Sequence, residues 1–406
     1  MISFDNTEYA FAHKTSDELK KAHFLFSAMG NSFLLKLGLS IVPLAIKWRV
    51  PFTQPILRST IFKQFVGGET LQETASVADK LEQFNVKVIL DYGVEGGKDG
   101  EQGFDSSTNE FIRVIEYAAT QKNIPFMSVK ITGLVRFELL EEIDAAMHHR
   151  EGSLVKRYQA VIEALETGKK EEWNRTIKRF ERICETAATN NVAVLVDAEE
   201  TWIQDPVDAL TMLMMDHYNK GRIVVYNTLQ LYRHDRLAFL KDSYTASIER
   251  NFILGAKLVR GAYMENERNR AQEIGYSSPI QPDKESCDRD YNAAIHFCIE
   301  HIDNIAVIVA THNEDSNAYA TSLLDENDLP HNHPHLHFSQ LYGMSDNITF
   351  NLARSGCSVS KYLPFGPIKD VVPYLMRRAQ ENSSVAGQTG RELGLIQKEL
   401  TRRKAV

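Results

Sequence analysis

The segment Ile305–Asn313, IAVIVATHN, decides the fold class of this chain. Six aliphatic residues come first, and the polar residues Thr311, His312 and Asn313 follow directly. A short apolar run without clean alternation is typical of a parallel strand that is covered on both faces. The segment therefore predicts a buried strand whose carboxyl end carries polar side chains.

Runs of the same kind recur along the chain, and each is followed by a stretch of helical character. Eight strands that alternate with helices predict an α/β fold, a closed parallel (β/α)8 barrel of the TIM type. The eight runs begin at Val86, Pro125, Val192, Arg222, Gly255, Ile305, His335 and Ser358.

The remaining residues predict additions to this barrel. We expect an N-terminal helical extension over residues 1–64, the catalytic barrel over 65–390 and a C-terminal tail over 391–406. The connection over 134–191, after the second run, is too long for one helix and predicts an insertion of at least two. Thr70 and Glu73 have the spacing of a capping box at the start of a helix that ends near Asn85.

Composition narrows the classes of function. The net charge of −8 disfavours a nucleic-acid partner, and the four cysteines form no CxxC pair that would suggest a zinc site. The N-terminus lacks the basic and apolar regions of a secretory signal. The apolar run Phe33–Ile46 is too short to span a bilayer, and we expect it to pack as a helix rather than to lie on a membrane surface.

Polar residues at the strand ends predict the functional site, since barrel enzymes place their active sites there. Any one of these residues has a simpler interpretation as a solvated strand edge, and His312 suits a structural role as well as a functional one. Their recurrence at eight strands nevertheless favours a shared site. The residues are Asp91, Glu95, Lys130, Asp197, Glu199, Gln230, Lys257, Arg260, Tyr263, Thr311, His312, Asn313, Gln340 and Tyr362.

Two other patterns bear on cofactors. The stretch HNHPHLH over residues 331–337 contains four histidines, but it holds no carboxylate and precedes its strand, so we predict no metal site. No GxGxxG joins a strand to a helix, so a Rossmann-type dinucleotide site is not indicated.

The helix that follows the last strand carries an unusual set of charges. In YLPFGPIKDVVPYLMRRAQENSS, residues 362–384, Tyr374 precedes Arg378 by four positions and Arg377 precedes Glu381 by four. All four side chains therefore crowd one side of the helix. A solvated face would explain them, but the two guanidinium groups also suit bidentate binding of a carboxylate, with Glu381 orienting one of them.

Four motifs together resemble the proline dehydrogenase family of flavin-dependent enzymes. They are LVDAEE, KLVRGAYMENERNRAQE, VATHN and the YLPFGPIKDVVPYLMRRAQENSS helix, and the similarity extends from about Phe65 to Ser384. The resemblance implies a distorted (β/α)8 barrel that binds FAD non-covalently, with the final helix above the barrel. It also implies oxidation of L-proline to 1-pyrroline-5-carboxylate by hydride transfer to FAD, in proline catabolism.

The resemblance implies roles for the matching residues. Asp197 and Lys257 match catalytic positions, although many bacterial members have an arginine in place of Lys257. Glu95 matches a gate that pairs with Arg377. The substrate-binding positions are Lys130, Arg377 and Arg378, which form a carboxylate clamp, and Tyr362, Tyr374 and Leu258, which surround the proline ring. The cofactor-binding positions are Gln230, Val259, Arg260, Gly261, Thr311, His312, Asn313 and Glu381.

The resemblance also implies a quinone or another electron-chain acceptor, and with it a cytoplasmic protein in peripheral contact with the inner face of a membrane. Met264 replaces a tryptophan of the bifunctional members, and the long insertion is similar to that of the longer stand-alone enzymes. Two other hypotheses fit the residues without the resemblance. One is a Schiff-base aldolase that uses Lys130 or Lys257, and the other is an amino-acid-binding barrel without catalysis.

Overall fold

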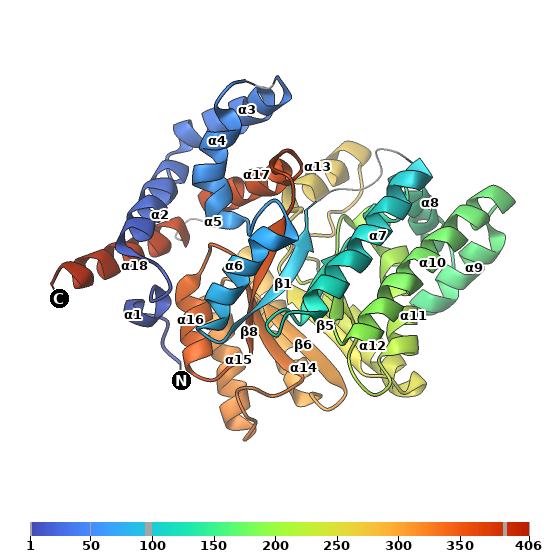
Figure 1. The fold of residues 1–406 in the computed structure, drawn as a ribbon. Coiled ribbons are helices and arrows are strands. Elements are labelled where there is room, and N and C mark those ends of the chain that lie inside the picture. Colours follow the sequence, from blue (N-terminus) through green and yellow to red (C-terminus); the bar gives the residue numbers. More distant parts are fainter. Residues whose placement is uncertain (1, 49, 94–99, 385–387, 406) are drawn as a thin grey trace. The chain divides into compact units, whose positions relative to one another are not determined.

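A computed structural model describes residues 2–48, 50–93, 100–384 and 388–405 of the chain. Its eight parallel strands form a closed barrel in which their order around the barrel is their order in the sequence. The predicted (β/α)8 architecture is thereby confirmed (Figure 1). The strands are β1 Val86–Tyr92, β2 Phe126–Val129, β3 Ala193–Val196, β4 Val225–Gln230, β5 Leu254–Val259, β6 Ile305–Ala310, β7 Leu336–Leu341 and β8 Val359–Phe365.

The strands are buried on both faces, as continuous apolar runs require. The register pairs Thr228 of β4 with Lys257 of β5, and Lys257 with Ile308 of β6. Neighbouring residues on a strand point to opposite faces, so this register also decides which side chains face the barrel interior.

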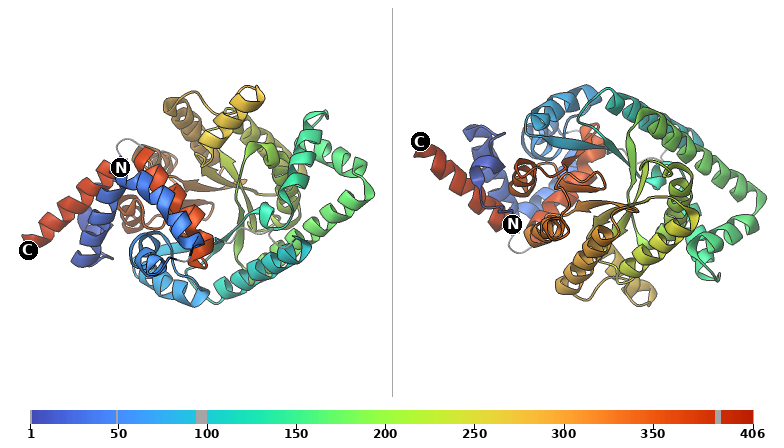
Figure 2. Two further views of the ribbon diagram at one scale, coloured as in Figure 1. Left: turned by 90° about the horizontal axis from the view of Figure 1, so that it is seen from above. Right: turned by 90° about the horizontal axis from the view of Figure 1, so that it is seen from below.

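Packing divides the chain into two compact units, one of residues 95–338 and one of residues 1–94 with 339–406. The predicted domain boundaries at residues 64 and 390 do not coincide with this division and stay predictions. In the first unit the helices lie outside the strands (Figure 2). They are α7 Gly100–Ala119, α8 Phe137–His148, α9 Leu154–Ala164, α10 Thr167–Asn190, α11 Gln204–Tyr218, α12 Arg236–Arg250, α13 Met264–Ile274, α14 Lys284–Glu300 and α15 Glu314–Glu326.

The predicted insertion after the second strand contains the three helices α8, α9 and α10. Trp173 of α10 is fully buried and donates a hydrogen bond to the Tyr158 hydroxyl of α9 at 2.7 Å. Arg179 of α10 forms ion pairs with Glu101 and Asp105 of α7. Aromatic packing therefore holds α9 and α10 of the insertion together, and the buried Arg179 fixes α10 to α7.

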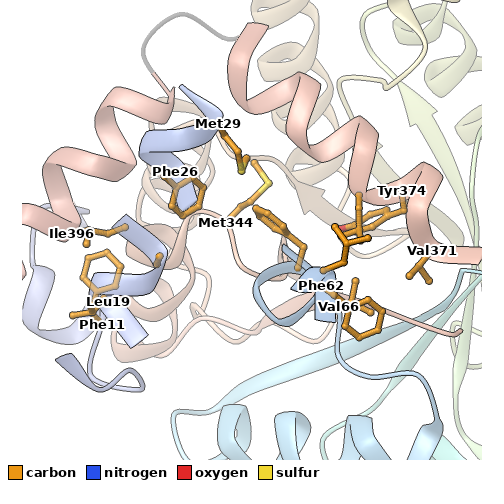
Figure 3. Close-up of a cluster of buried hydrophobic side chains, with 14 of the residues drawn as sticks. Phe11, Leu19, Phe26, Met29, Phe62, Val66, Met344, Val371, Tyr374 and Ile396 are labelled. Atoms are coloured by element: carbon orange, nitrogen blue, oxygen red, sulfur yellow. The ribbon is translucent and has the colours of Figure 1, made fainter. Parts of the chain in front are cut away.

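The second compact unit joins the two ends of the chain. An apolar cluster that includes Phe26, Tyr374 and Ile396 unites segments far apart in the sequence (Figure 3). Its helices are α1 Thr7–Ala10, α2 Ser16–Met29, α3 Ser32–Lys47, α4 Thr53–Leu57, α5 Lys63–Phe65, α6 Leu71–Glu82, α16 Asp346–Arg354, α17 Ile368–Ser384 and α18 Gln388–Lys404, with a π-helical turn η1 over Arg58–Phe62. The predicted C-terminal tail is thus largely the helix α18.

A buried ionic group reinforces this unit. Lys361 of β8 lies 2.9 Å from the Asp346 carboxylate at the start of α16, and Lys14 lies 2.7 Å from it. Burial opposes ionisation of Asp346, but the positive charges of Lys14 and Lys361 outweigh burial and hold its pKa well below the usual range. Burial also lowers the pKa of His13, which contacts the same carboxylate, to about 4.

The capping box predicted at α6 is only half present. The Thr70 hydroxyl accepts a hydrogen bond from the Glu73 backbone N–H at 3.3 Å. The Glu73 carboxylate, however, accepts from the backbone N–H of Glu69 at 2.8 Å and not from that of Thr70. The carboxylate therefore fixes the turn one residue before the cap.

No helix among the described residues is long and apolar enough to cross a membrane.

Candidate active site

An ion pair joins the ends of two strands inside the barrel. Lys257 of β5 is 5% exposed, and its ammonium group pairs with the carboxylate of Asp197, which directly follows β3. The backbone N–H of Asp197 donates to the Val129 carbonyl of β2 at 2.9 Å, which fixes the start of the loop after β3. The structure thus brings the two predicted catalytic residues into contact.

Strand β4, between β3 and β5, places two further polar side chains in the interior. The Asn227 amide donates to Asp208 of the outer helix α11, so Thr228 and Gln230 lie on the opposite, inward face. Among the described residues, no hydrogen-bond partner reaches Thr228 Oγ1 or Gln230 Oε1, although both atoms are buried. Buried polar atoms are normally paired, so these two suit a bound polar molecule.

The same alternation disagrees with the predicted role of Leu258. Lys257 faces the interior, so the next side chain along β5 faces the helices, and Leu258 is fully buried there. The Leu258 carbonyl accepts a hydrogen bond from the Tyr291 hydroxyl of α14. This position fits packing of the outer layer and does not fit contact with a substrate inside the barrel.

A second charged group lies beside this ion pair. The Glu199 carboxylate accepts hydrogen bonds of 2.8 and 3.0 Å from the Thr132 hydroxyl. Burial raises the pKa of Glu199 to about 7, against the opposing effect of the positive charge of Lys130. The sequence placed Glu199 among the strand-end residues but gave it no role, and Thr132 carried no signal.

The ends of β5 and β6 meet in a network around Arg260. Its guanidinium group donates to the Thr311 hydroxyl, to Asp288 of α14 at 2.6 and 2.9 Å, and to Ser316 of α15 at 3.1 Å. The Asn313 side chain caps α15 by accepting from the Ser316 backbone N–H at 2.8 Å. Three predicted cofactor-binding residues, Arg260, Thr311 and Asn313, are therefore neighbours, whereas Asp288 and Ser316 were not predicted.

The neighbouring predicted residues end the same two strands. Val259 and His312 are half-buried, and Gly261 directly follows Arg260. Gly261 has φ +130°, and a Cβ atom there would lie 2.4 Å from the Tyr232 ring. Only glycine fits between this ring and the turn.

The predicted tyrosines and arginines of the substrate site belong to the second compact unit. Tyr362 is half-buried on β8, on the face opposite Lys361. On α17, Arg377 is half-buried and Arg378 is 6% exposed, with its guanidinium carbon 5.1 Å from the centre of the Tyr374 ring. Figure 3 shows Tyr374 next to Val371 in the apolar cluster.

Several predicted roles are left without a structural account. Lys130 and the two arginines belong to different units, so the predicted carboxylate clamp stays a prediction. Glu95 and the side chain of Glu381 lie outside the described residues. Within the described part of the chain, no group of three or more histidine, cysteine, aspartate or glutamate residues could hold a metal ion.

The fold and the site define a (β/α)8 barrel protein with a charged interior at the carboxyl ends of its strands. The sequence model described as proline dehydrogenase matches residues 74–391. This chain therefore belongs to the proline dehydrogenase family.

Three individual relatives have different names. The chain is 33% identical over 377 residues to proline dehydrogenase 1, mitochondrial, of Dictyostelium discoideum, covering 86% of this chain and 65% of that protein. It is 35% identical to the carbapenem antibiotics biosynthesis protein CarD of Pectobacterium carotovorum, covering 86% of this chain and 85% of that one. It is 31% identical to hydroxyproline dehydrogenase of Xenopus laevis, with coverage of 86% and 78%.

Solved structures confirm the fold. Proline utilization A from Bdellovibrio bacteriovorus superimposes with a TM-score of 0.71 at 18% identity, covering 93% of this chain and 38% of that chain. The present chain thus spans less than two thirds of both the Dictyostelium protein and this larger protein.

Proposed function

We propose that this chain is an FAD-dependent proline dehydrogenase that oxidises L-proline to 1-pyrroline-5-carboxylate in proline catabolism. The observation that carries the proposal is the family match over residues 74–391, which encloses both the Lys257–Asp197 ion pair and the Arg260 network. The match to the Dictyostelium protein named proline dehydrogenase supports the same activity.

The polar groups at the strand ends suit FAD. The buried Thr228 Oγ1 and Gln230 Oε1 lack partners among the described residues and can pair with a polar ring system. The Arg260 network, which includes Thr311 and Asn313, offers a positive charge and hydroxyl and amide groups to a phosphate-bearing molecule. When bound, FAD supplies the acceptor for the hydride that leaves the ring carbon beside the proline nitrogen.

The residues of the chain bind and orient the substrate in this proposal. Arg377 and Arg378, with Lys130, hold the proline carboxylate, and Tyr362 packs against the ring. Glu95 acts as the gate that pairs with Arg377 and excludes water when the substrate is bound.

The ion pair disfavours the aldolase alternative. A lysine that forms a Schiff base needs a free amine that can attack a carbonyl group. The Lys257 amine is instead engaged by the Asp197 carboxylate, and Lys130 lies close enough to Glu199 to influence its pKa. A fixed, charged Lys257 suits the orientation of a cofactor or substrate better than covalent catalysis.

We further propose a quinone or another electron-chain acceptor for the reduced cofactor, and peripheral contact of this cytoplasmic protein with the inner face of a membrane. The requirement for a second electron transfer supports this part of the proposal, because each turnover leaves two electrons on the cofactor.

A substrate panel tests the activity. Purified protein supplied with FAD and a soluble dye acceptor should oxidise L-proline faster than D-proline or trans-4-hydroxy-L-proline. The exposed Arg289 on α14 provides a control, since Arg289→Met should leave all three rates unchanged. Equal or faster oxidation of hydroxyproline would assign the chain to the activity named for the Xenopus relative, and no oxidation of any substrate would contradict the proposal.

A further inference from the structure

We propose that the hairpin formed by α3 and α4, residues 32–48 and 50–57, docks on an anionic lipid surface. This inference names the surface that would make the membrane contact proposed above, and it does not depend on which substrate the barrel oxidises. It stands on the distribution of exposed apolar side chains and on that of charge.

Exposed apolar side chains concentrate on the hairpin. Of the thirteen large hydrophobic residues exposed in the described part of the chain, seven lie between residues 33 and 56. Trp48 and Phe52, in and beside the turn, are 76% and 77% exposed. The others are Phe33, Ile41, Leu44, Val50 and Ile56. Scattered exposed apolar residues are normal, but a group of this size marks an interaction surface.

The helix α3 is apolar on two faces. Val42 and Ile46 pack against the apolar cluster of the unit, and Val42 also lines an apolar cavity of about 150 Å³ between α2, α3, η1 and α17. Ile41 and Leu44 point away from this cluster and are at least half exposed. Apolar side chains on a helix are normally covered, whereas Ile41 and Leu44, on the outer face of α3, stay exposed.

The hairpin is a folded element and not a loose apolar segment. Hydrogen bonds of 2.9 Å link the Trp48 N–H to the Leu44 carbonyl and the Val50 N–H to the Ala45 carbonyl. These bonds pair backbone groups at the end of α3, so docking would not bury those N–H and C=O groups without hydrogen-bond partners. The α3 helix is nevertheless too short to span a bilayer, which leaves an interfacial position for it.

The charge of the segment identifies the partner. From Lys20 to Gly68 the sequence contains seven lysine and arginine residues and no aspartate or glutamate, whereas the whole chain has a net charge of −8. The rest of the chain therefore carries −15. Lys47 is exposed beside Trp48. Arg58, which directly follows α4, pairs with Glu69, yet its side chain stays 64% exposed. A tryptophan with flanking cations is typical of an interfacial anchor on anionic lipid.

Flotation with vesicles tests this proposal on the full chain loaded with FAD. The protein should bind phosphatidylcholine vesicles that contain phosphatidylglycerol, bind pure phosphatidylcholine vesicles much more weakly, and dissociate as salt is raised. The double variant Trp48→Ser, Phe52→Ser should lose at least about tenfold in partitioning, because two large apolar groups no longer insert. The double variant Lys47→Gln, Arg58→Gln removes two positive charges without placing a carboxylate beside Glu69, and it should lose a similar factor on anionic vesicles only.

Matched controls separate docking from general stickiness. Ile274→Ser with Tyr276→Ser changes two apolar residues of the other compact unit that are 62% and 40% exposed, and Lys122→Glu reverses an exposed charge in that unit. Neither change should affect partitioning. Oxidation of proline with a soluble dye should be equal in all variants, so a failure of the proposed activity would leave the vesicle result interpretable.

Two outcomes would overturn the proposal. One is failure of the unaltered protein to bind anionic vesicles. The other is self-association that Trp48→Ser with Phe52→Ser abolishes, in a protein that does not bind vesicles, which would assign the hairpin to a second copy of the chain.

Discussion

Replacing Lys257 by methionine should destabilise the barrel as well as abolish its activity. Methionine fills much of the same space, so the main change is the loss of positive charge. Asp197 would keep its carboxylate in a site where Lys257 is 5% exposed and the Asp197 side chain 13% exposed. Removing one partner of a buried ion pair costs roughly 3–5 kcal/mol, and the partial exposure of Asp197 reduces this to about 2–4 kcal/mol.

A double-mutant cycle separates stability from function. Asp197→Asn in the Lys257→Met background removes the unpaired charge, so the double variant should recover about 1–3 kcal/mol relative to the sum of the single changes. Proline oxidation should stay low in all three variants, because the charges at the reaction site are still missing. Urea unfolding followed by circular dichroism gives the midpoints and slopes from which these energies are obtained.

The control is Lys284→Met on the surface, whose side chain is 67% exposed and pairs with Asp288. It should change the free energy of unfolding by less than about 0.5 kcal/mol. Additive effects of Lys257→Met and Asp197→Asn, or an unchanged midpoint in Lys257→Met, would refute the reasoning that the pair is buried and coupled.

Three further predictions concern single side chains. The pKa of Glu199 is raised to about 7, so the folded state favours its neutral form. The free energy of unfolding of Glu199→Gln, measured in urea, should therefore rise by about 1–3 kcal/mol relative to that of the unaltered protein as pH increases from 4.5 to above 7, and the two should not differ in this way at lower pH. Arg378→Met should lower kcat/KM for proline by the equivalent of about 2–4 kcal/mol while FAD content stays constant, and an unchanged kcat/KM would return this arginine to a packing role. Tyr362→Ser should reduce the preference for proline over trans-4-hydroxy-L-proline, mainly because kcat/KM for proline falls. An unpaired substrate hydroxyl against the phenol costs roughly 1–3 kcal/mol. An unchanged ratio of kcat/KM for the two substrates would show that Tyr362 does not determine the preference.

The strands were predictable because burial on both faces leaves a direct trace in the sequence. Aliphatic runs such as IAVIVA are typical of parallel strands that are covered on both faces, and all eight strands lie where short runs rich in β-branched and aliphatic residues were predicted. The polar residues that follow them were visible for the same reason. Helix numbers were harder, because the boundaries within 134–191 depend on short turns, and three helices form where at least two were expected.

Pairings across the fold were not predictable from spacing. Nothing in the sequence links Arg260 to Asp288, or Lys361 to Asp346 and Lys14, because these contacts depend on how the helices pack on the barrel. The position of Leu258, in contrast, could have been found. Once Lys257 is assigned to the interior, alternation along the strand directs Leu258 to the helices.

The exposure of one face of α3 was also not predictable from the sequence. The apolar run Phe33–Ile46 predicted a packed helix, and Val42 and Ile46 do pack. Ile41 and Leu44 are instead 50% and 56% exposed. Composition alone records how apolar a segment is but not how much of it the fold covers.

The central claim is that L-proline reduces FAD bound in this barrel. Anaerobic mixing of the purified, FAD-loaded protein with L-proline, followed by visible absorbance, tests the claim most directly. We predict that the flavin absorbance bleaches with L-proline, does so poorly with D-proline, and that the solution then contains 1-pyrroline-5-carboxylate. A protein that takes up no FAD, or one whose bound flavin stays oxidised in excess L-proline, would contradict the claim.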